Sequence, residues 1–152
     1  MGLVGGFGSA SVRGPAEAEA RETESMVAVL NADEQAVHDA VLDYVEGIYE
    51  VAPERIERSV HPTMRKYGYV RRGESWGGTP MTYDQLHQLA ATYNAEGQIG
   101  PDAPKEITVF DVLDKTASAK LVAAWGVDYF HLAEVGGRWQ IMNVLWQTPP
   151  QQ

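Results

Sequence analysis

The sequence predicts an α+β domain in which helices come first and an antiparallel sheet follows. Apolar residues recur at helical spacing between residues 31 and 61, and again between residues 82 and 97. From Lys105 onward the apolar period becomes that of strands, and Gly136-Gly137 marks a tight turn between two of them. Helices followed by a meander of long strands are typical of a domain whose helices pack on one face of a sheet.

Length and composition exclude several classes of function. A chain of 152 residues has the size of one domain. Its net charge of -9, with only 12 Lys and Arg, disfavours nucleic acid and anionic lipid as partners. The absence of cysteine excludes disulfides, a thiol nucleophile and a thiolate zinc site. No apolar run approaches the ~20 residues that span a bilayer, and no leader peptide is evident, so we expect no membrane partner and a cytoplasmic location.

The first 30 residues are predicted to form a flexible tail, because a Gly/Ser stretch and an acidic Ala/Glu stretch offer few large apolar side chains. A partner-docking peptide around Phe7 is the alternative. The domain proper is predicted to span residues 31–149. It opens at Asn31, which can cap a helix while Glu34 reaches back to it.

Three helices are predicted. The first carries one buried stripe, formed by Val37, Val41, Tyr44, Val45 and Ile48. Pro53 starts a short second helix, which His61-Pro62 ends because a residue before proline leaves the α region. Thr82 and Gln85 form a capping box for the third helix, which runs to Gly97.

Strands are predicted in the remaining segments. Residues 64–76 mix Tyr and Val with Arg and Gly, which indicates a short hairpin or irregular strands, and Gly77, Gly78 and Pro80 indicate a loop. Ile107 to Phe110 begins a strand, and Ala117 to Leu132 is long enough for one bent strand. The Gly-Gly turn then leads into residues 138–147, so that residues 127–146 form a hairpin.

A two-residue turn in this hairpin fixes which side chains share a face. It predicts an inner face toward the helices, with two polar exceptions, Asp128 and Asn143, among apolar neighbours: Phe130, Leu132, Trp139, Ile141 and Leu145. The outer face then carries Val127, Tyr129, His131, Met142, Val144 and Trp146. Because this face is also apolar, a second subunit is the expected cover, which predicts a homodimer through Tyr129, His131, Val144 and Trp146.

The tract DYFHLAEVGGRWQIMNVLW, residues 128–146, together with His61-Pro62 after two short helices, resembles the putative lumazine-binding family of the nuclear transport factor two-like superfamily. The likeness spans residues 32–149. It implies a cone-shaped roll, in which a strongly curved antiparallel sheet wraps around N-terminal helices and leaves a pocket at one end. It also implies dimers formed through the sheets. The superfamily includes ketosteroid isomerase, scytalone dehydratase and limonene-epoxide hydrolase, so the resemblance fixes no reaction.

Asp128 is the leading candidate for chemistry, because an apolar pocket wall raises the pKa of a carboxyl group and suits a general acid or base. Asn143 would orient a substrate or a water molecule, and His61 at the pocket mouth would stabilise developing charge. Asp128 and His61 each have a structural alternative. Asp128 can accept hydrogen bonds within the core, and His61 can bond a nearby carbonyl.

Aromatic side chains are the candidate ligand-binding residues, since they can stack on a flat compound: Tyr67, Tyr69, Trp76, Tyr93 and Phe130. The alternative is that they are core residues. His38 and His87 lack a second ligand at helical spacing, so no metal and no cofactor are expected. The sequence therefore predicts a protein that binds an apolar or aromatic small molecule. The alternatives are a cofactor-independent isomerase, dehydratase or hydrolase that uses Asp128, or a non-catalytic dimerisation or assembly module.

Overall fold

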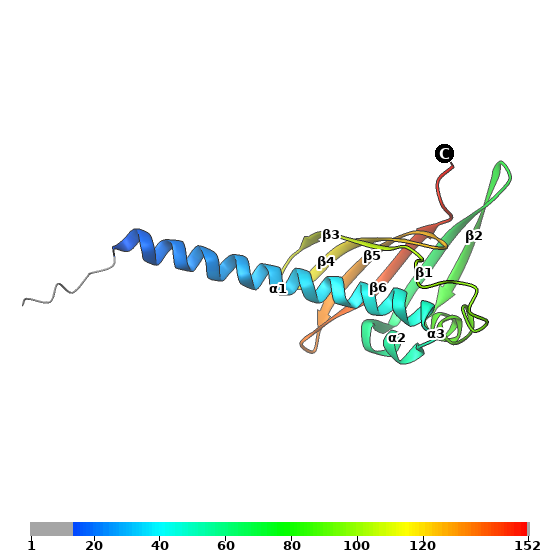
Figure 1. Cartoon of the computed structure of the whole chain (residues 1–152), viewed down its shortest axis with the longest axis horizontal. Coiled ribbons are helices and arrows are strands. Elements are labelled where there is room, and N and C mark those ends of the chain that lie inside the picture. The colour runs from blue at the N-terminus through cyan, green and yellow to red at the C-terminus, as the bar shows by residue number, and fades with distance from the viewer. Residues whose placement is uncertain (1–13, 152) are drawn as a thin grey trace, which may run out of the picture.

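A curved six-stranded sheet wraps around one long helix in the computed structural model, which describes residues 14–151 except for the side chains of residues 20–31. The strand order is β2-β1-β6-β5-β4-β3. Helix α1 (Pro15–Tyr49) lies across the sheet, and α2 (Pro53–Ser59) and α3 (Tyr83–Thr92) cover one end of it (Figure 1). The predicted α+β class is confirmed. All neighbouring strands are antiparallel except β1 and β6, which are parallel.

Helix α1 begins at Pro15, so the predicted helix start at Asn31 is wrong. Pro15 occupies the first helical turn, where its missing N–H costs no hydrogen bond. The Ala/Glu-rich segment that follows consists of strong helix formers, and extending an existing helix avoids the cost of nucleation. The part of the predicted flexible tail from Pro15 onward is therefore helical, whereas residues 1–13 lie outside the described residues.

The third helix confirms the capping box that the sequence predicts. The Thr82 hydroxyl accepts a hydrogen bond from the backbone N–H of Gln85 at 3.3 Å, and Gln85 Oε1 accepts one from the backbone N–H of Thr82 at 2.9 Å. The helix ends at Thr92, before Gly97. This cap fixes where the chain leaves the sheet, and it directs Leu86 and Leu89 toward α1 and β1.

Strands β1 (Val60–Arg72) and β2 (Ser75–Thr82) form one long hairpin. The predicted loop at Gly77, Gly78 and Pro80 is wrong, because all three residues belong to β2, which pairs only with β1. An edge strand tolerates glycine and proline, since one side of it needs no hydrogen-bond partners. His61 lies in β1 directly after α2.

Strands β3 (Lys105–Val112), β4 (Thr116–Ala123) and β5 (Gly126–Val135) follow as an antiparallel meander. The single bent strand predicted for residues 117–132 is wrong, because the chain reverses at Ala124 and Trp125. Gly126 makes this possible. Its φ of 145° is unfavourable for other residues, and a Cβ at this position would lie 1.9 Å from the carbonyl oxygen of Gln147.

The last hairpin, formed by β5 and β6 (Arg138–Gln147), is confirmed. Its division into faces is partly wrong, because β6 has a bulge. His131 pairs with Asn143 and Leu132 pairs with Ile141, so that Met142 is an extra residue that shifts the alternation of side chains. Beyond the bulge, Asn143 and Leu145 lie on the outer face, while Val144 and Trp146 turn inward.

The core lies between α1 and the concave face of the sheet. Tyr44, Val45 and Ile48 of α1 are buried against Phe130 and Ile141 of the last hairpin. The Tyr44 and Phe130 rings meet edge to face, with centroids 5.1 Å apart. These contacts place the C-terminal half of α1 along the axis of the cone, with α3 at its end.

Candidate functional site

A small apolar cavity lies at the end of the cone, between α3 and the sheet. Its volume is about 190 Å³, and its lining comes from α1, β1, β2, α3, β6 and the β4–β5 turn: Ile48, Lys66, Met81, Leu89, Tyr93, Trp125 and Trp146. Ile48 and Lys66 are buried, whereas Met81, Leu89 and Tyr93 are half-buried. The cavity therefore has an enclosed floor and a rim that solvent reaches.

The Trp146 indole reaches the cavity across Gly68, its partner on the neighbouring strand. A Cβ at Gly68 would lie 2.0 Å from Trp146 Nε1, so only glycine leaves room for the indole in this position. The bulge in β6 directs Trp146 inward. The sequence-based face assignment put Trp146 on the outer face and so missed it as a cavity residue.

Trp125 forms a second wall of the cavity and is held on several sides. The rings of Tyr49, Tyr93 and Tyr44 meet it edge to face, with centroids 5.6, 5.8 and 6.3 Å away. Its indole N–H donates a 2.8 Å hydrogen bond to Asp128 Oδ1. The Tyr49 hydroxyl accepts a 2.9 Å hydrogen bond from the backbone N–H of Ala124, which anchors the turn that presents Trp125. The orientation of this indole is thus fixed by the fold.

Lys66 places an amine in the apolar wall of the cavity. Its residue exposure is 5%, and Nζ lies 2.5 Å from the Tyr44 hydroxyl. The Tyr44, Trp146 and Trp125 rings surround Nζ at 5.2, 5.4 and 5.9 Å. Burial lowers the pKa of Lys66, while the negative charge of Asp128 opposes that shift. Sequence reasoning missed this residue, because lysine is rarely buried in a protein core.

Asp128 is fully buried on the inner face, as its predicted position requires. Oδ1 accepts the Trp125 hydrogen bond, and Oδ2 is buried with no partner of normal hydrogen-bond geometry. Burial raises the pKa of Asp128, although the charge of Lys66 and the Trp125 and Tyr44 donors act in the opposite direction. Asp128 does not line the cavity. It lies behind Trp125, whose indole does.

The predicted ligand-binding residues divide between the cavity and other surfaces. Tyr93 lines the cavity, and Phe130 is a core residue packed on Tyr44. Tyr67, Tyr69 and Trp76 do not line this cavity, because the alternation of β1 and β2 turns them outward, where they are 41%, 46% and 44% exposed.

Asn143 and His61 also lie away from the cavity. The bulge at Met142 moves Asn143 to the outer face, so the expectation that Asn143 shares the inner face with Asp128 is wrong. There its amide donates to the Arg65 carbonyl at 3.4 Å. His61 Nδ1 lies 2.7 Å from the Thr63 hydroxyl at the start of β1. The structure does not bring His61 and Asp128 together at one site.

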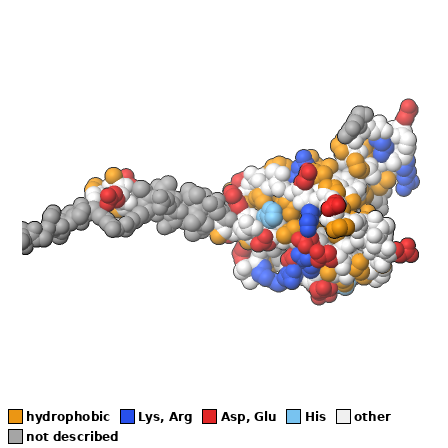
Figure 2. Space-filling model, in the orientation of Figure 1, with side chains coloured by type: hydrophobic (Ala, Val, Ile, Leu, Met, Phe, Trp, Pro, Cys, Tyr) orange, Lys and Arg blue, Asp and Glu red, His pale blue; other side chains and the backbone are white. Residues whose placement is uncertain are grey.

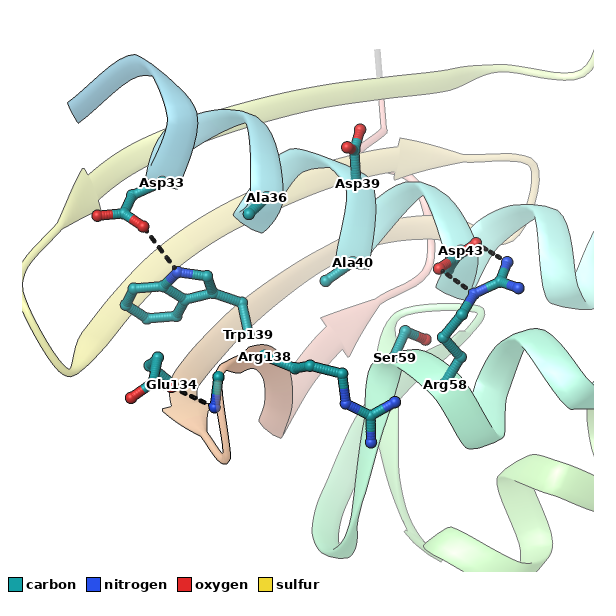
Figure 3. Close-up of a pocket in the computed structure, with 11 residues that line it drawn as sticks. Asp33, Ala36, Asp39, Ala40, Asp43, Arg58, Ser59, Glu134, Arg138 and Trp139 are labelled. Carbon is teal, nitrogen blue, oxygen red and sulfur yellow. Dashed lines mark hydrogen bonds and ion pairs between the residues drawn. The ribbon is translucent and has the colours of Figure 1, made fainter. Parts of the chain in front are cut away.

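A larger groove of about 360 Å³ lies between the middle of α1 and the β5–β6 turn (Figure 3). Most of its polar groups are already engaged. Asp43 accepts hydrogen bonds from Arg55 and Arg58, and Glu134 Oε1 accepts one from the backbone N–H of Gly137. On the face of the domain shown in Figure 2, basic and acidic side chains lie interspersed. This groove has the character of a solvated surface with ion pairs.

Two further features would point to a class of function: a cluster of metal ligands and a helix that spans a membrane. No group of three His, Cys, Asp or Glu side chains in the described part of the chain is placed to hold a metal ion. No described helix combines the length and the apolar character needed to cross a bilayer.

Comparison with solved structures shows the fold that these features occupy. An NTF2-like protein of unknown function from Shewanella baltica has a TM-score of 0.62 and 18% identity, over 79% of this chain and 96% of the other. A domain of unknown function with a cystatin-like fold from Nostoc punctiforme has a TM-score of 0.61 and 13% identity, over 79% of each chain. A protein described as a putative scytalone dehydratase from Novosphingobium aromaticivorans has a TM-score of 0.55 and 10% identity, over 82% of this chain and 89% of the other.

These TM-scores establish a shared NTF2-like, cystatin-like fold. Identities this low do not establish a shared reaction. No curated protein sequence matches the chain. A family match covers residues 32–147, which is more than half of the chain and includes every residue that lines the cavity. The chain therefore belongs to the protein family described as putative lumazine-binding.

Proposed function

We propose that this protein binds a compact, flat and largely apolar small molecule in the cavity between α3 and the sheet. The observation that carries the proposal is an apolar cavity of about 190 Å³ whose wall contains one buried amine, Lys66. Pockets for drug-sized ligands usually measure roughly 300–1,000 Å³. A compound of one or two rings is therefore the size that this cavity favours.

The lining also indicates how such a ligand would be oriented. Trp125, Trp146 and Tyr93 offer aromatic faces and edges to a planar ring. Lys66 Nζ donates to one protein acceptor, the Tyr44 hydroxyl, and an ammonium group has three donors. A carbonyl or acidic oxygen on the ligand would accept from it. The description of the family makes lumazine, a planar two-ring compound with carbonyl oxygens, the first probe.

Lumazine is expected to raise the thermal unfolding midpoint of the protein. A ligand present at about 100 times its Kd stabilises the folded state by about 2.7 kcal/mol, which corresponds to roughly 5–10 °C for a domain of this size. Differential scanning fluorimetry at increasing lumazine concentration measures the shift. A panel of one-ring and two-ring aromatic carbonyl compounds extends the test, and no shift with any of them would contradict the proposal.

A variant that fills the cavity provides the control for this experiment. Leu89→Trp adds a large ring at the half-buried rim, and it is expected to abolish the ligand-induced shift. The matched substitution Leu113→Trp lies at a position that is 58% exposed and outside the cavity, so it is expected to preserve the shift. Equal shifts in both variants would place binding elsewhere on the protein.

Asp128 acting as a general acid or base in an isomerase, dehydratase or hydrolase is the alternative function. Its raised pKa and the unpaired Oδ2 favour that role. Against it, Asp128 does not line the cavity, and Oδ1 is occupied by the Trp125 indole. These contacts support a positioning role, in which Asp128 holds Trp125 and balances the charge of Lys66.

The outer face of the sheet supports a homodimer with a different set of residues from the predicted one. Leu145 lies between Tyr67 on β1 and Tyr129 on β5 in the strand register, and Phe110 stacks on Tyr129 with centroids 6.5 Å apart. All four side chains are between 41% and 55% exposed. An apolar row across β1, β6 and β5, with Phe110 beyond Lys120 of β4, is suited to a second copy of the same face. Val144 and Trp146 take no part in it, because they point inward.

Leu145→Glu is expected to yield a monomer, because it places a charge at the centre of this apolar row. Sedimentation velocity measures the change. Val51→Glu introduces the same charge at an exposed apolar residue in the α1–α2 turn, away from the sheet, and it should leave the dimer intact. A monomeric wild-type protein, or a dimer that survives Leu145→Glu, would argue against this interface.

A further inference from the structure

Lys66 differs from every other lysine in the chain. The sequence contains three more, Lys105, Lys115 and Lys120, and none of them is buried. The Lys105 and Lys115 side chains are 44% and 64% exposed, and each lies near a glutamate. Lys66 instead lies at the floor of an apolar cavity with its amine among aromatic rings. Burying an amine in this setting is costly, and a structural role does not require it to face a cavity.

We propose that Lys66 captures a compact aldehyde or ketone in this cavity as a reversible imine. The inference rests on the proposed binding function and adds to it the chemical class of the ligand and a covalent step. Its basis is the juxtaposition of an amine, a hydroxyl group 2.5 Å from it and an apolar space large enough for a one-ring carbonyl compound.

The covalent step balances without an oxidant, a reductant or a cofactor. The lone pair of neutral Nζ attacks the carbonyl carbon, the C=O π bond breaks, and one proton moves from the nitrogen to the oxygen to give a carbinolamine. That hydroxyl group then leaves as water together with the remaining proton of the nitrogen, and the C=N bond forms. The net change is one amine and one carbonyl compound giving one imine and one water molecule, and hydrolysis reverses it.

The surroundings of Lys66 suit each part of this step. Burial lowers the pKa of the amine, which increases the fraction that is neutral and nucleophilic near neutral pH. The Tyr44 hydroxyl lies within hydrogen-bond distance of Nζ and can relay a proton to the departing oxygen. Asp128 is the nearby carboxyl group that can exchange a proton with this hydroxyl, since Oδ2 has no other partner. The apolar lining limits the water that would hydrolyse the imine.

Reductive trapping tests the inference in the wild-type protein. Benzaldehyde, a one-ring aldehyde, is incubated with the full chain, and sodium cyanoborohydride converts any imine to a stable benzyl amine. Peptide mass spectrometry then locates the adducts. We expect labelling of Lys66 to exceed that of Lys105, Lys115 and Lys120 several-fold, although all three are more accessible. Labelling of Lys66 that only equals or falls below theirs would overturn the inference.

Variants identify the cavity as the cause of the selectivity. Leu89→Trp is expected to suppress labelling of Lys66 while leaving that of Lys115 unchanged. Lys66→Arg keeps the positive charge without a nucleophilic amine and should lose the main adduct, whereas Lys115→Arg should retain it. Circular dichroism confirms that each variant is folded. The comparison among lysines within the wild-type chain tests the inference even if Lys66→Arg fails to fold.

The two proposals fail in distinguishable ways. A thermal shift with lumazine that is not accompanied by selective labelling of Lys66 supports binding and overturns imine formation. Selective labelling that Leu89→Trp abolishes supports the imine even if lumazine causes no shift. Labelling of Lys66 that Leu89→Trp leaves unchanged overturns the role of the cavity in directing the carbonyl compound.

Discussion

Asp128→Ala is expected to lower the free energy of unfolding by about 3–5 kcal/mol, the range typical of breaking a buried charge pair from one side. Lys66 is 5% exposed, and the charge of Asp128 is what opposes the effect of its burial. The substitution also removes the acceptor of the Trp125 indole N–H. Urea unfolding at pH 7, followed by tryptophan fluorescence and by circular dichroism, measures the loss.

A double-mutant cycle separates the charge from the hydrogen bond. Asp128→Asn keeps an oxygen that can accept from Trp125 but removes the charge, and Lys66→Met removes the amine at similar length. If the two groups balance one another, the double variant loses less stability than the sum of the single variants, by about 0.5–3 kcal/mol. Additive losses would show that Lys66 and Asp128 do not depend on one another.

Local sequence signals predicted the parts of the fold that short-range contacts determine. The Thr82 and Gln85 capping box and the Gly136-Gly137 turn both occur as expected, because each depends on residues within a few positions of one another. The inward position of Asp128 also follows from the turn, since that residue lies in β5, whose alternation runs without interruption from the turn.

Positions beyond Met142 could not be predicted, because the bulge leaves no trace in the alternation of the sequence. Val144, Leu145 and Trp146 are all apolar, so either face of β6 could be buried. The register shift at Met142 turns Trp146 toward the candidate site and Asn143 away from it. Lys66 was missed for a related reason, since a lysine in a strand is normally solvent-facing. Its burial depends on long-range contacts with α1 and β5 that periodicity does not report.

Trp125 shows how a single glycine links the fold to the cavity. The turn that presents this indole exists because Gly126 adopts a φ of 145° beside the backbone of Gln147. The apolar pattern from Ala117 to Leu132 is long enough for one bent strand. The conformation of Gly126 overrides that pattern and turns Trp125 toward Tyr49, Tyr93 and the cavity.

Gly126→Ala is therefore expected to destabilise the protein by about 3 kcal/mol or more, since it adds backbone strain and a severe clash. The new Cβ would lie 1.9 Å from a backbone oxygen, and a backbone group at the end of β6 cannot rotate away as a flexible side chain would. Urea unfolding measures the loss of stability. Because the clash pushes apart the β4–β5 turn and the end of β6, Trp125 and Trp146 should separate, and any ligand-induced thermal shift should shrink.

Gly100→Ala is the matched control, because its backbone conformation is ordinary and a Cβ there would meet no atom within 4 Å. It is expected to change the free energy of unfolding by less than about 0.5 kcal/mol, as surface substitutions usually do. A loss in Gly126→Ala no larger than in Gly100→Ala would mean that the turn accommodates a side chain. In that case the position of Trp125 would depend on its ring contacts and on Asp128 alone, and the Asp128 variants would then show the larger effect on ligand binding.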